Sequence, residues 1–121
     1  MISVDVILED KRWSKKIKKP SIFFSKLLKL FQKRYSFSNK RANLSILLSN
    51  NNNIKKLNKK FRKKNKPTDI LSFPFDRKFN KNTVLYLGDM IISYDFMEKP
   101  KTLLATEFKK KLIKIFIHGF L

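Results

Sequence analysis

The spacing of apolar residues changes several times along the chain, and this change constrains the fold more than any other feature. In Met1–Leu8 the residues Ile2, Val4 and Val6 alternate with polar neighbours, which predicts a half-buried strand. After Ser21, a predicted N-cap, the spacing becomes helical and runs through Phe24, Leu27, Leu28, Phe31 and Tyr35. The first third of the chain therefore predicts both a strand and an amphipathic helix.

The remaining segments continue this mixture. Further strands are predicted at Asn43–Ser49, Ile70–Phe75 and Val84–Ile92. Helices are predicted around Trp13 and Ile17, after the Asn50–Asn53 run (Ile54, Leu57 and Phe61), and from Thr102 onward, where Leu104, Phe108, Leu112 and Ile115 share a face with His118 near it. We predict one α+β domain over residues 1–121, a small mixed sheet of about four strands packed with helices.

Rare residue types exclude whole classes of site. The chain has no cysteine, which excludes disulfides, thiol nucleophiles and cysteine-based zinc or iron–sulfur sites. Its only histidine is His118, so one copy of the chain cannot supply two histidine ligands. No apolar run reaches the roughly 18 residues of a membrane-spanning helix. The N-terminus lacks the apolar region of a signal peptide, and we expect a cytoplasmic location.

The charge is strongly positive, with 29 Lys and Arg against 9 Asp and Glu, for a net charge of +20. The densest stretch is Lys55–Lys66, with eight cations and no carboxylate. Such a field favours a polyanion, because each neutralised phosphate releases condensed counterions. The abundance of Lys, Asn, Ile and Phe also fits drift from an AT-rich coding sequence, so both explanations of the overall charge remain open.

Three motifs stand in order along the chain: LNKKFRKKNKPTDILSFP at residues 57–74, LGDMII at residues 87–92 and HGFL at residues 118–121. The first is long and specific, whereas the last alone is weak. Together they resemble the YbeY family of bacterial rRNA maturation endoribonucleases. The resemblance implies a zinc-hydrolase-like fold and a metal-dependent, single-strand-specific endoribonuclease (a hydrolase) that acts in 16S rRNA maturation and ribosome quality control, with rRNA and the small ribosomal subunit as partners.

The resemblance also implies a zinc site. The family pattern H-G-x-L-H-L-x-G-x-D-H holds zinc with three histidines, and by that match His118 is the first ligand. The sequence stops at Leu121, before the other two positions, so we expect an incomplete domain and an incomplete zinc site. Because a catalytic zinc needs three protein ligands and an open position, we expect little or no zinc-dependent cleavage by this chain.

The same match implies a catalytic role for Arg62, whose guanidinium suits the negative charge that develops at a scissile phosphate. The lysines expected to follow an RNA backbone are Lys59, Lys60, Lys63, Lys64 and Lys66. Asn65 is expected to add a hydrogen bond, and Asp69 to cap the backbone with Thr68 or to orient a site histidine. Architectural roles are expected for Ser72, Phe73, Pro74, Gly88 and Asp89.

Each of these residues also has a purely structural explanation. A lysine on a solvated helix face needs no ligand, and a single histidine on a helix often serves as a core or cap residue. Two other functions therefore stay open. One is a non-catalytic basic protein that binds RNA or the ribosome, and the other is a metal-dependent hydrolase of a different substrate.

Overall fold

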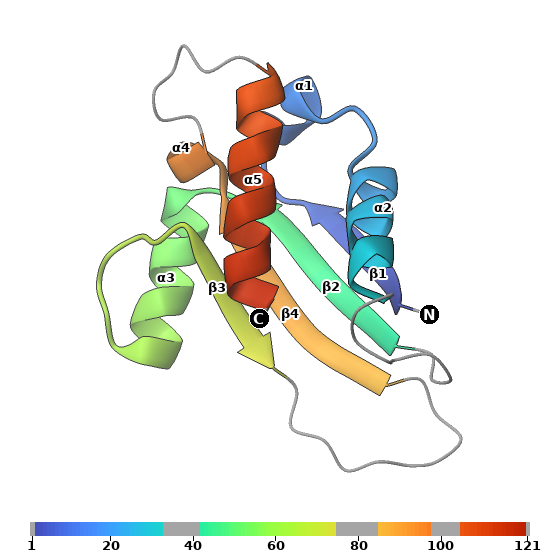
Figure 1. Cartoon of the computed structure of the whole chain (residues 1–121). Coiled ribbons are helices and arrows are strands. Elements are labelled where there is room, and N and C mark those ends of the chain that lie inside the picture. Colours follow the sequence, from blue (N-terminus) through green and yellow to red (C-terminus); the bar gives the residue numbers. More distant parts are fainter. Residues whose placement is uncertain (1, 33–41, 75–84, 98–104, 121) are drawn as a thin grey trace.

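The computed structural model describes residues 2–32, 42–74, 85–97 and 105–120. Its elements in chain order are β1 (Ile2–Leu8), α1 (Trp13–Lys16), α2 (Pro20–Gln32), β2 (Ala42–Ser49), α3 (Asn51–Arg62), β3 (Ile70–Pro74), β4 (Leu85–Ser93), α4 (Tyr94–Met97) and α5 (Ala105–Phe120). The four described strands form one sheet in the order β1-β2-β4-β3 (Figure 1). The first two pairings are parallel, and β3 runs antiparallel to β4. The predicted α+β fold with a small mixed sheet is confirmed.

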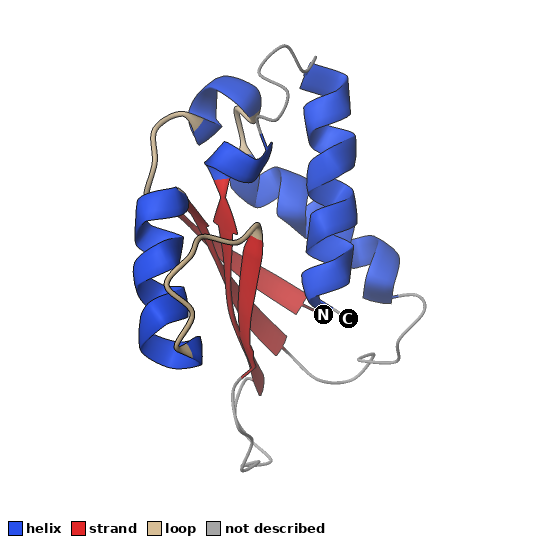
Figure 2. Ribbon diagram, turned by 90° about the vertical axis from the view of Figure 1, so that its left-hand side faces the viewer, coloured by secondary structure: helices blue, strands red, loops and turns tan. Residues whose placement is uncertain are grey.

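Helices cover both faces of this sheet. Figure 2 shows α3 on one face and α2 and α5 on the other. Alternation along each strand explains the division, because successive side chains point to opposite faces. On β3, Ile70 belongs to the core under α2 and α5, whereas Leu71 belongs to the smaller core under α3. The edge strand β3 therefore contributes side chains to both cores, one on each face of the sheet.

The larger core is built around aromatic rings from distant parts of the chain. The buried ring of Trp13 lies edge-on to Tyr94 and Phe108, with centroid distances of 5.5 and 5.8 Å. Phe24 of α2 lies 5.4 Å from Phe116 of α5. Such pairs add to the hydrophobic stabilisation that burial provides. This core joins α1, α2 and α5 to the sheet.

The core under α3 is smaller. Ile54 of α3 packs against Leu71 and Ile91, with Leu57 and Phe73 partly buried beside them. The helix begins after Asn50, whose side chain accepts a hydrogen bond from the Asn53 backbone N–H at 2.9 Å. That geometry is an N-cap, which satisfies one of the free N–H groups of the first turn. The helix predicted to carry Ile54, Leu57 and Phe61 is confirmed, and Asn50 is its cap.

Some predicted details differ from the structure. Ser21 is not the N-cap of α2, because the helix begins at Pro20, whose fixed φ suits the first helical position. His118 is exposed, since each residue turns the helix by about 100° and His118 follows the buried Phe116 by two positions. The short helix α4 had no periodic signal. The predicted positions Tyr35, Phe75, Val84 and Thr102–Leu104 lie outside the described residues.

Candidate nucleic-acid interface

Helix α3 has one apolar face and one cationic face. Ile54, Leu57 and Asn58 turn toward the sheet, and the lysines between them are exposed. The basic stretch continues into the loop after the helix, and all eight of its cations are exposed. We call these side chains the α3 cation cluster: Lys55, Lys56, Lys59, Lys60, Arg62, Lys63, Lys64 and Lys66. The predicted RNA-binding lysines and Arg62 all belong to it.

The chain turns sharply where α3 ends. Lys63 adopts a left-handed conformation with φ of 57°, and its N–H bonds to the carbonyls of Asn58 and Lys59. The Lys64 N–H also bonds to the Asn58 carbonyl, at 3.3 Å. A left-handed residue that closes the last turn is the usual way to satisfy the final carbonyls of a helix. This cap aims the following lysines away from the helix axis.

A buried amide holds the loop that carries these lysines. The side chain of Asn58 is 1% exposed, and its Nδ2 donates to the Lys66 carbonyl at 2.8 Å. Its Oδ1 has no hydrogen-bond partner among the described residues. Because a buried amide bonded to a carbonyl costs free energy to release, the loop is fixed against the inner face of α3. The cations of the loop are thus presented from an ordered backbone.

The α3 cation cluster lacks carboxylate partners in the part of the chain that the structure describes. The ion pairs found there both involve Arg12, with Asp10 and with Asp95. An array of unpaired exposed cations produces a positive potential that attracts polyanions. Arg62, in particular, has a guanidinium that is open to solvent.

An aromatic pair fixes the end of α3 against the edge strand. The rings of Phe61 and Phe73 lie 5.3 Å apart at 64°, an edge-to-face arrangement. Phe73 lies on the α3 side of β3, next to Ser72 on the other side. Arg62 follows Phe61 directly, so this contact also fixes the position of the Arg62 backbone.

The end of α5 is fixed against the other side of β3. The Ser72 hydroxyl donates to the Gly119 carbonyl at 2.9 Å. A Cβ on Gly119 would lie 2.6 Å from Ile70 Cδ1 and 3.1 Å from Met90 Cε, so a larger residue here would require these two side chains to move. The glycine after His118 therefore lets the last turn of α5 rest directly on the sheet.

Arg62 and His118 lie on opposite sides of β3. The ends of α3 and α5 point toward the same end of the molecule (Figure 1). Their helices, however, cover opposite faces of the sheet (Figure 2). The contacts of Phe61 with Phe73 and of Gly119 with Ser72 bring the ends of both helices to the same edge strand.

The metal site is a separate question. Within the described ranges, no group of three His, Cys, Asp or Glu side chains is arranged to hold a metal ion. A zinc site with three protein ligands therefore does not fit the described residues by themselves. His118 offers one exposed imidazole at the end of α5.

The other predicted site residues have structural contacts. Asp69 Oδ1 accepts a hydrogen bond from the Ile70 N–H at 2.7 Å, so the predicted capping of a backbone group by Asp69 is confirmed, whereas the Thr68 hydroxyl donates to the Asp69 side chain at 3.3 Å. Gly88 has φ of 130° beside the register shift between β2 and β4, where a side chain would be strained. Asp89 pairs with Phe73 across the β3–β4 ladder.

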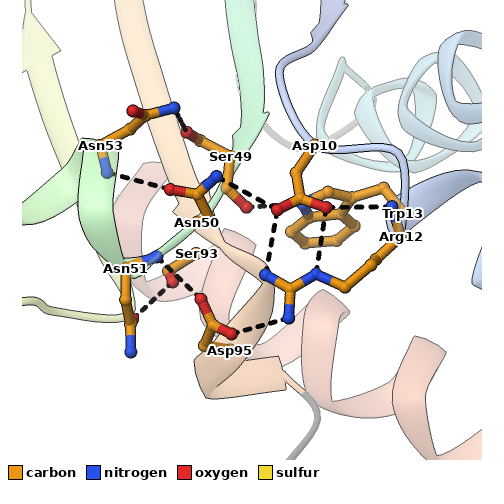
Figure 3. A network of polar contacts seen from close by, with 9 residues as sticks. All are labelled: Asp10, Arg12, Trp13, Ser49, Asn50, Asn51, Asn53, Ser93 and Asp95. Carbon is orange, nitrogen blue, oxygen red and sulfur yellow. Dashed lines mark hydrogen bonds and ion pairs between the residues drawn. The ribbon is translucent and has the colours of Figure 1, made fainter.

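A second polar centre lies where the carboxyl ends of the parallel strands β2 and β4 meet (Figure 3). The sequence predicted no ion pair or polar cluster there. Here Arg12 bridges two carboxylates, Asp10 at 2.9 Å and Asp95 at 2.8 Å. Asp10 also accepts from the Asn50 side chain, and Asp95 from the Asn51 N–H. We call this set the polar network.

The polar network shifts the pKa values of its charged groups. Hydrogen bonds from Arg12 lower the pKa of Asp10 to about 2. Burial alone would raise the pKa of Asp95, but hydrogen bonds from Arg12 and the Asn51 N–H outweigh it and lower that pKa. The hydrogen bonds that Arg12 donates to Asp10 and Asp95 raise its own pKa. Since the opposite charges face one another, their electrostatic potentials largely cancel, and little is left to attract a charged ligand. The network instead connects the segment after β1 with the starts of α3 and α4.

Comparisons with known proteins agree with these observations. The family model "Endoribonuclease YbeY" matches residues 7–121. A Pelagibacter ubique protein named "Endoribonuclease YbeY" is 62% identical over 121 residues, which is 100% of this chain and 79% of the relative. One from Ehrlichia ruminantium (strain Gardel) with the same name is 36% identical over 121 residues, 100% of this chain and 74% of the relative.

A solved structure shares the fold. The solution structure of TM1509 from Thermotoga maritima superposes with a TM-score of 0.57 and 23% identity, covering 98% of this chain and 69% of that one. Among the helices that the structure describes, none has both the length and the apolar character to cross a membrane.

Proposed function

Because the chain belongs to the YbeY family, we propose that it is an endoribonuclease that cleaves single-stranded RNA in the maturation of 16S rRNA and in ribosome quality control. The observation that carries this proposal is the α3 cation cluster, eight exposed cations without a described carboxylate partner. The names of the relatives support the reaction, and the unpaired charge supports RNA as the substrate. The small ribosomal subunit is the proposed partner, and the cytoplasm the proposed location.

RNA binding is assigned to the lysines of the α3 cation cluster. Two of these lysines lie in the last turn of α3, and three lie in the following loop, which Asn58 holds: Lys59 and Lys60, and Lys63, Lys64 and Lys66. Ammonium groups at such spacing can each meet a phosphate of a flexible strand. Asn65, exposed in the same loop, is placed to add a hydrogen bond.

Arg62 is the proposed catalytic residue. A guanidinium stays protonated, donates two parallel hydrogen bonds to phosphate oxygens and stabilises negative charge as it develops. Its exposure at the edge of the sheet leaves these donors available. The contact between Phe61 and Phe73 fixes the backbone from which Arg62 extends.

Zinc is the proposed cofactor, with His118 as one ligand. The described residues do not complete such a site, because no group of three ligating side chains is arranged among them. When bound, zinc would supply a Lewis acid and an activated water. Gly119 and Ser72 are proposed to position the turn that carries His118.

Residues 1–121 are proposed to belong to one YbeY-like domain. The alternative of a binding protein without catalysis is less favoured, because the relatives at 62% and 36% identity are both named as endoribonucleases. Zinc-dependent hydrolysis of another substrate is also less favoured, since the unpaired cations fit a polyanion.

The test compares two proteins, the 121-residue chain and the same chain extended by His-Leu-x-Gly-x-Asp-His. We expect the extended protein to bind zinc and to cleave single-stranded rRNA, with loss of cleavage on chelation, whereas the shorter chain binds RNA but cleaves little. Arg62→Lys in the extended protein should lower kcat more than RNA affinity. If the extended, zinc-loaded protein binds rRNA without cleaving it, the non-catalytic alternative holds.

A further inference from the structure

Phe61 is an unusual surface residue. Its side chain is 57% exposed, and it is the sole aromatic among the large apolar side chains exposed in the described ranges, which are Ile7, Leu8, Ile22, Leu30 and Phe61. It continues the apolar face of α3 after Ile54 and Leu57, yet it stays open to solvent where Ile54 is fully buried. Its contact with Phe73 therefore uses only part of the ring, and more than half of the side chain stays open to solvent.

The ring is held in place despite its exposure. Phe73 supports it from β3, with centroids 5.3 Å apart. The Lys60 ammonium lies 5.2 Å from its centroid, within the range of a cation–π contact. A phenyl ring has only two side-chain torsions, so these contacts leave little further entropy to lose when a ligand covers the exposed part of the ring.

The surroundings of Phe61 indicate the chemistry of the ligand. The neighbours along the chain are Lys59, Lys60, Arg62, Lys63 and Lys64, all exposed. An apolar protein partner would require a wider apolar surface than one ring amid cations. A nucleic acid strand combines both features, since phosphates suit the ammonium groups and a base suits the ring.

We propose that Phe61 is a stacking platform for one unpaired base of RNA, beside the phosphate that meets Arg62. This inference rests on the proposed function and adds a reason for its selectivity for single strands. In duplex RNA each base is already stacked and paired, so a ring on the protein surface cannot cover it. Lysines and Arg62 alone would bind single and double strands through their phosphates with little distinction.

Fluorescence tests the contact directly. The only tryptophan is Trp13, which is 0% exposed and donates its indole N–H to the Ser49 carbonyl. The unmodified chain should therefore keep its emission when single-stranded RNA is added. Phe61→Trp should add an exposed indole whose emission is quenched by single-stranded RNA and unchanged by a duplex of equal length. Equal quenching by both would overturn the proposal.

Affinity tests the contribution to binding. Phe61→Leu should weaken binding of a single-stranded RNA oligonucleotide by about 5-fold or more, because stacking on an aromatic ring contributes substantially per base. The slope of log affinity against log salt should not change, since no phosphate contact is lost. Phe61→Tyr, which keeps the ring, should bind like the unmodified chain. Leu30→Ala, at an exposed apolar residue of α2, is the matched control and should have no effect.

The outcomes separate this inference from the proposed function. Equal affinity of Phe61→Leu and the unmodified chain for single-stranded RNA, with both proteins folded by circular dichroism, would overturn the stacking role and leave the endoribonuclease proposal intact. An unmodified chain that binds no RNA would contradict the proposed function itself. A loss of duplex and single-strand binding to the same extent in Phe61→Leu would indicate a packing role and also overturn the stacking role.

Discussion

The molecule has two polar regions, and they treat charge in opposite ways. In the polar network one guanidinium, Arg12, bridges Asp10 and Asp95 and joins the segment after β1 to the start of α4. In the α3 cation cluster eight cations have no described carboxylate partner. In the polar network the opposite charges largely cancel each other's electrostatic potential. The α3 cation cluster keeps a positive potential that can attract an external polyanion. The two regions therefore differ in whether their charges are paired, and the unpaired one is the region proposed to bind RNA.

The largest effect on stability is expected where the polar network meets the core. Trp13→Ala should lower the free energy of unfolding by about 3–5 kcal/mol, because it empties a buried aromatic site. It also leaves the Ser49 carbonyl without its indole donor. Urea denaturation followed by circular dichroism measures the change. RNA affinity of the molecules that remain folded should not change, and a parallel loss of affinity would contradict the separation of the two regions.

The reverse pattern is expected at the α3 cation cluster. Replacing Lys59, Lys60, Lys63 and Lys64 by Gln should weaken RNA binding by about 100-fold at physiological salt and flatten the salt slope by about 3, as loss of four phosphate contacts predicts. The unfolding free energy should change by less than about 0.5 kcal/mol, as for other exposed sites. Filter binding at several salt concentrations measures the slope. Replacing Lys15, Lys18, Lys26 and Lys29 by Gln is a control of equal charge change at exposed positions elsewhere.

Acid should weaken the polar network. The pKa of Asp10 is about 2 when folded, below its ordinary value of 3.8. A lowered folded pKa contributes stability above the unfolded value, and that stability is lost as pH falls from about 5 to 2. We expect about 1–2 kcal/mol to be lost in this range, after allowance for the partly exposed Arg12. Asp95, with a pKa also lowered, acts in the same direction.

The control for this pH dependence is Asp10→Asn, which keeps the shape of the side chain and removes its titration. Its unfolding free energy, measured by urea titration at several pH values, should vary less between about pH 5 and 2 than that of the unmodified chain. An identical pH dependence in both proteins would show that Asp10 is not the responsible group.

The smallest effect is expected at Lys63, which both caps α3 with a left-handed backbone and carries one charge of the α3 cation cluster. Lys63→Gly should relieve the left-handed backbone and raise the unfolding free energy by about 0.5 kcal/mol. The same change removes one cation, so the salt slope of RNA binding should fall by about 0.7. Lys63→Asn, which tolerates this conformation, is the matched variant. A loss of stability in Lys63→Gly would mean that the lysine side chain itself supports the cap.

Local patterns predicted the elements well and their assembly less well. The alternation in β1 and the cap at Asn50 depend on neighbouring residues, so the sequence displays them directly. The bridge from Arg12 to Asp95 joins residues 83 apart and follows no periodic pattern. The insertion of β4 between β2 and β3 likewise depends on how the strands pair in space.

The candidate site shows the same division. The basic run made the α3 cation cluster visible in the sequence, and the motif identified Arg62. The sequence could not show that Phe61 stays more than half exposed, because helical spacing alone assigns it to the core face. Nor could it show that Arg62 and His118 stand on opposite faces of β3, since that depends on the sheet order. The catalytic role of Arg62 and the zinc-ligand role of His118 stay predictions.

The packing of α5 has a consequence for how the chain acquires its structure. Phe108, Leu112 and Phe116 complete a core whose other members include Trp13 and Phe24, nearly the whole sequence away. Contacts between residues so far apart in the sequence form only after a large loop has closed. The entropy lost in closing that loop slows folding. During synthesis the earlier segments would emerge with their aromatic surface uncovered, and that surface would be covered only when α5 follows. Until that point the uncovered aromatic surface exposes the nascent chain to aggregation, so we expect folding to wait for the synthesis of α5.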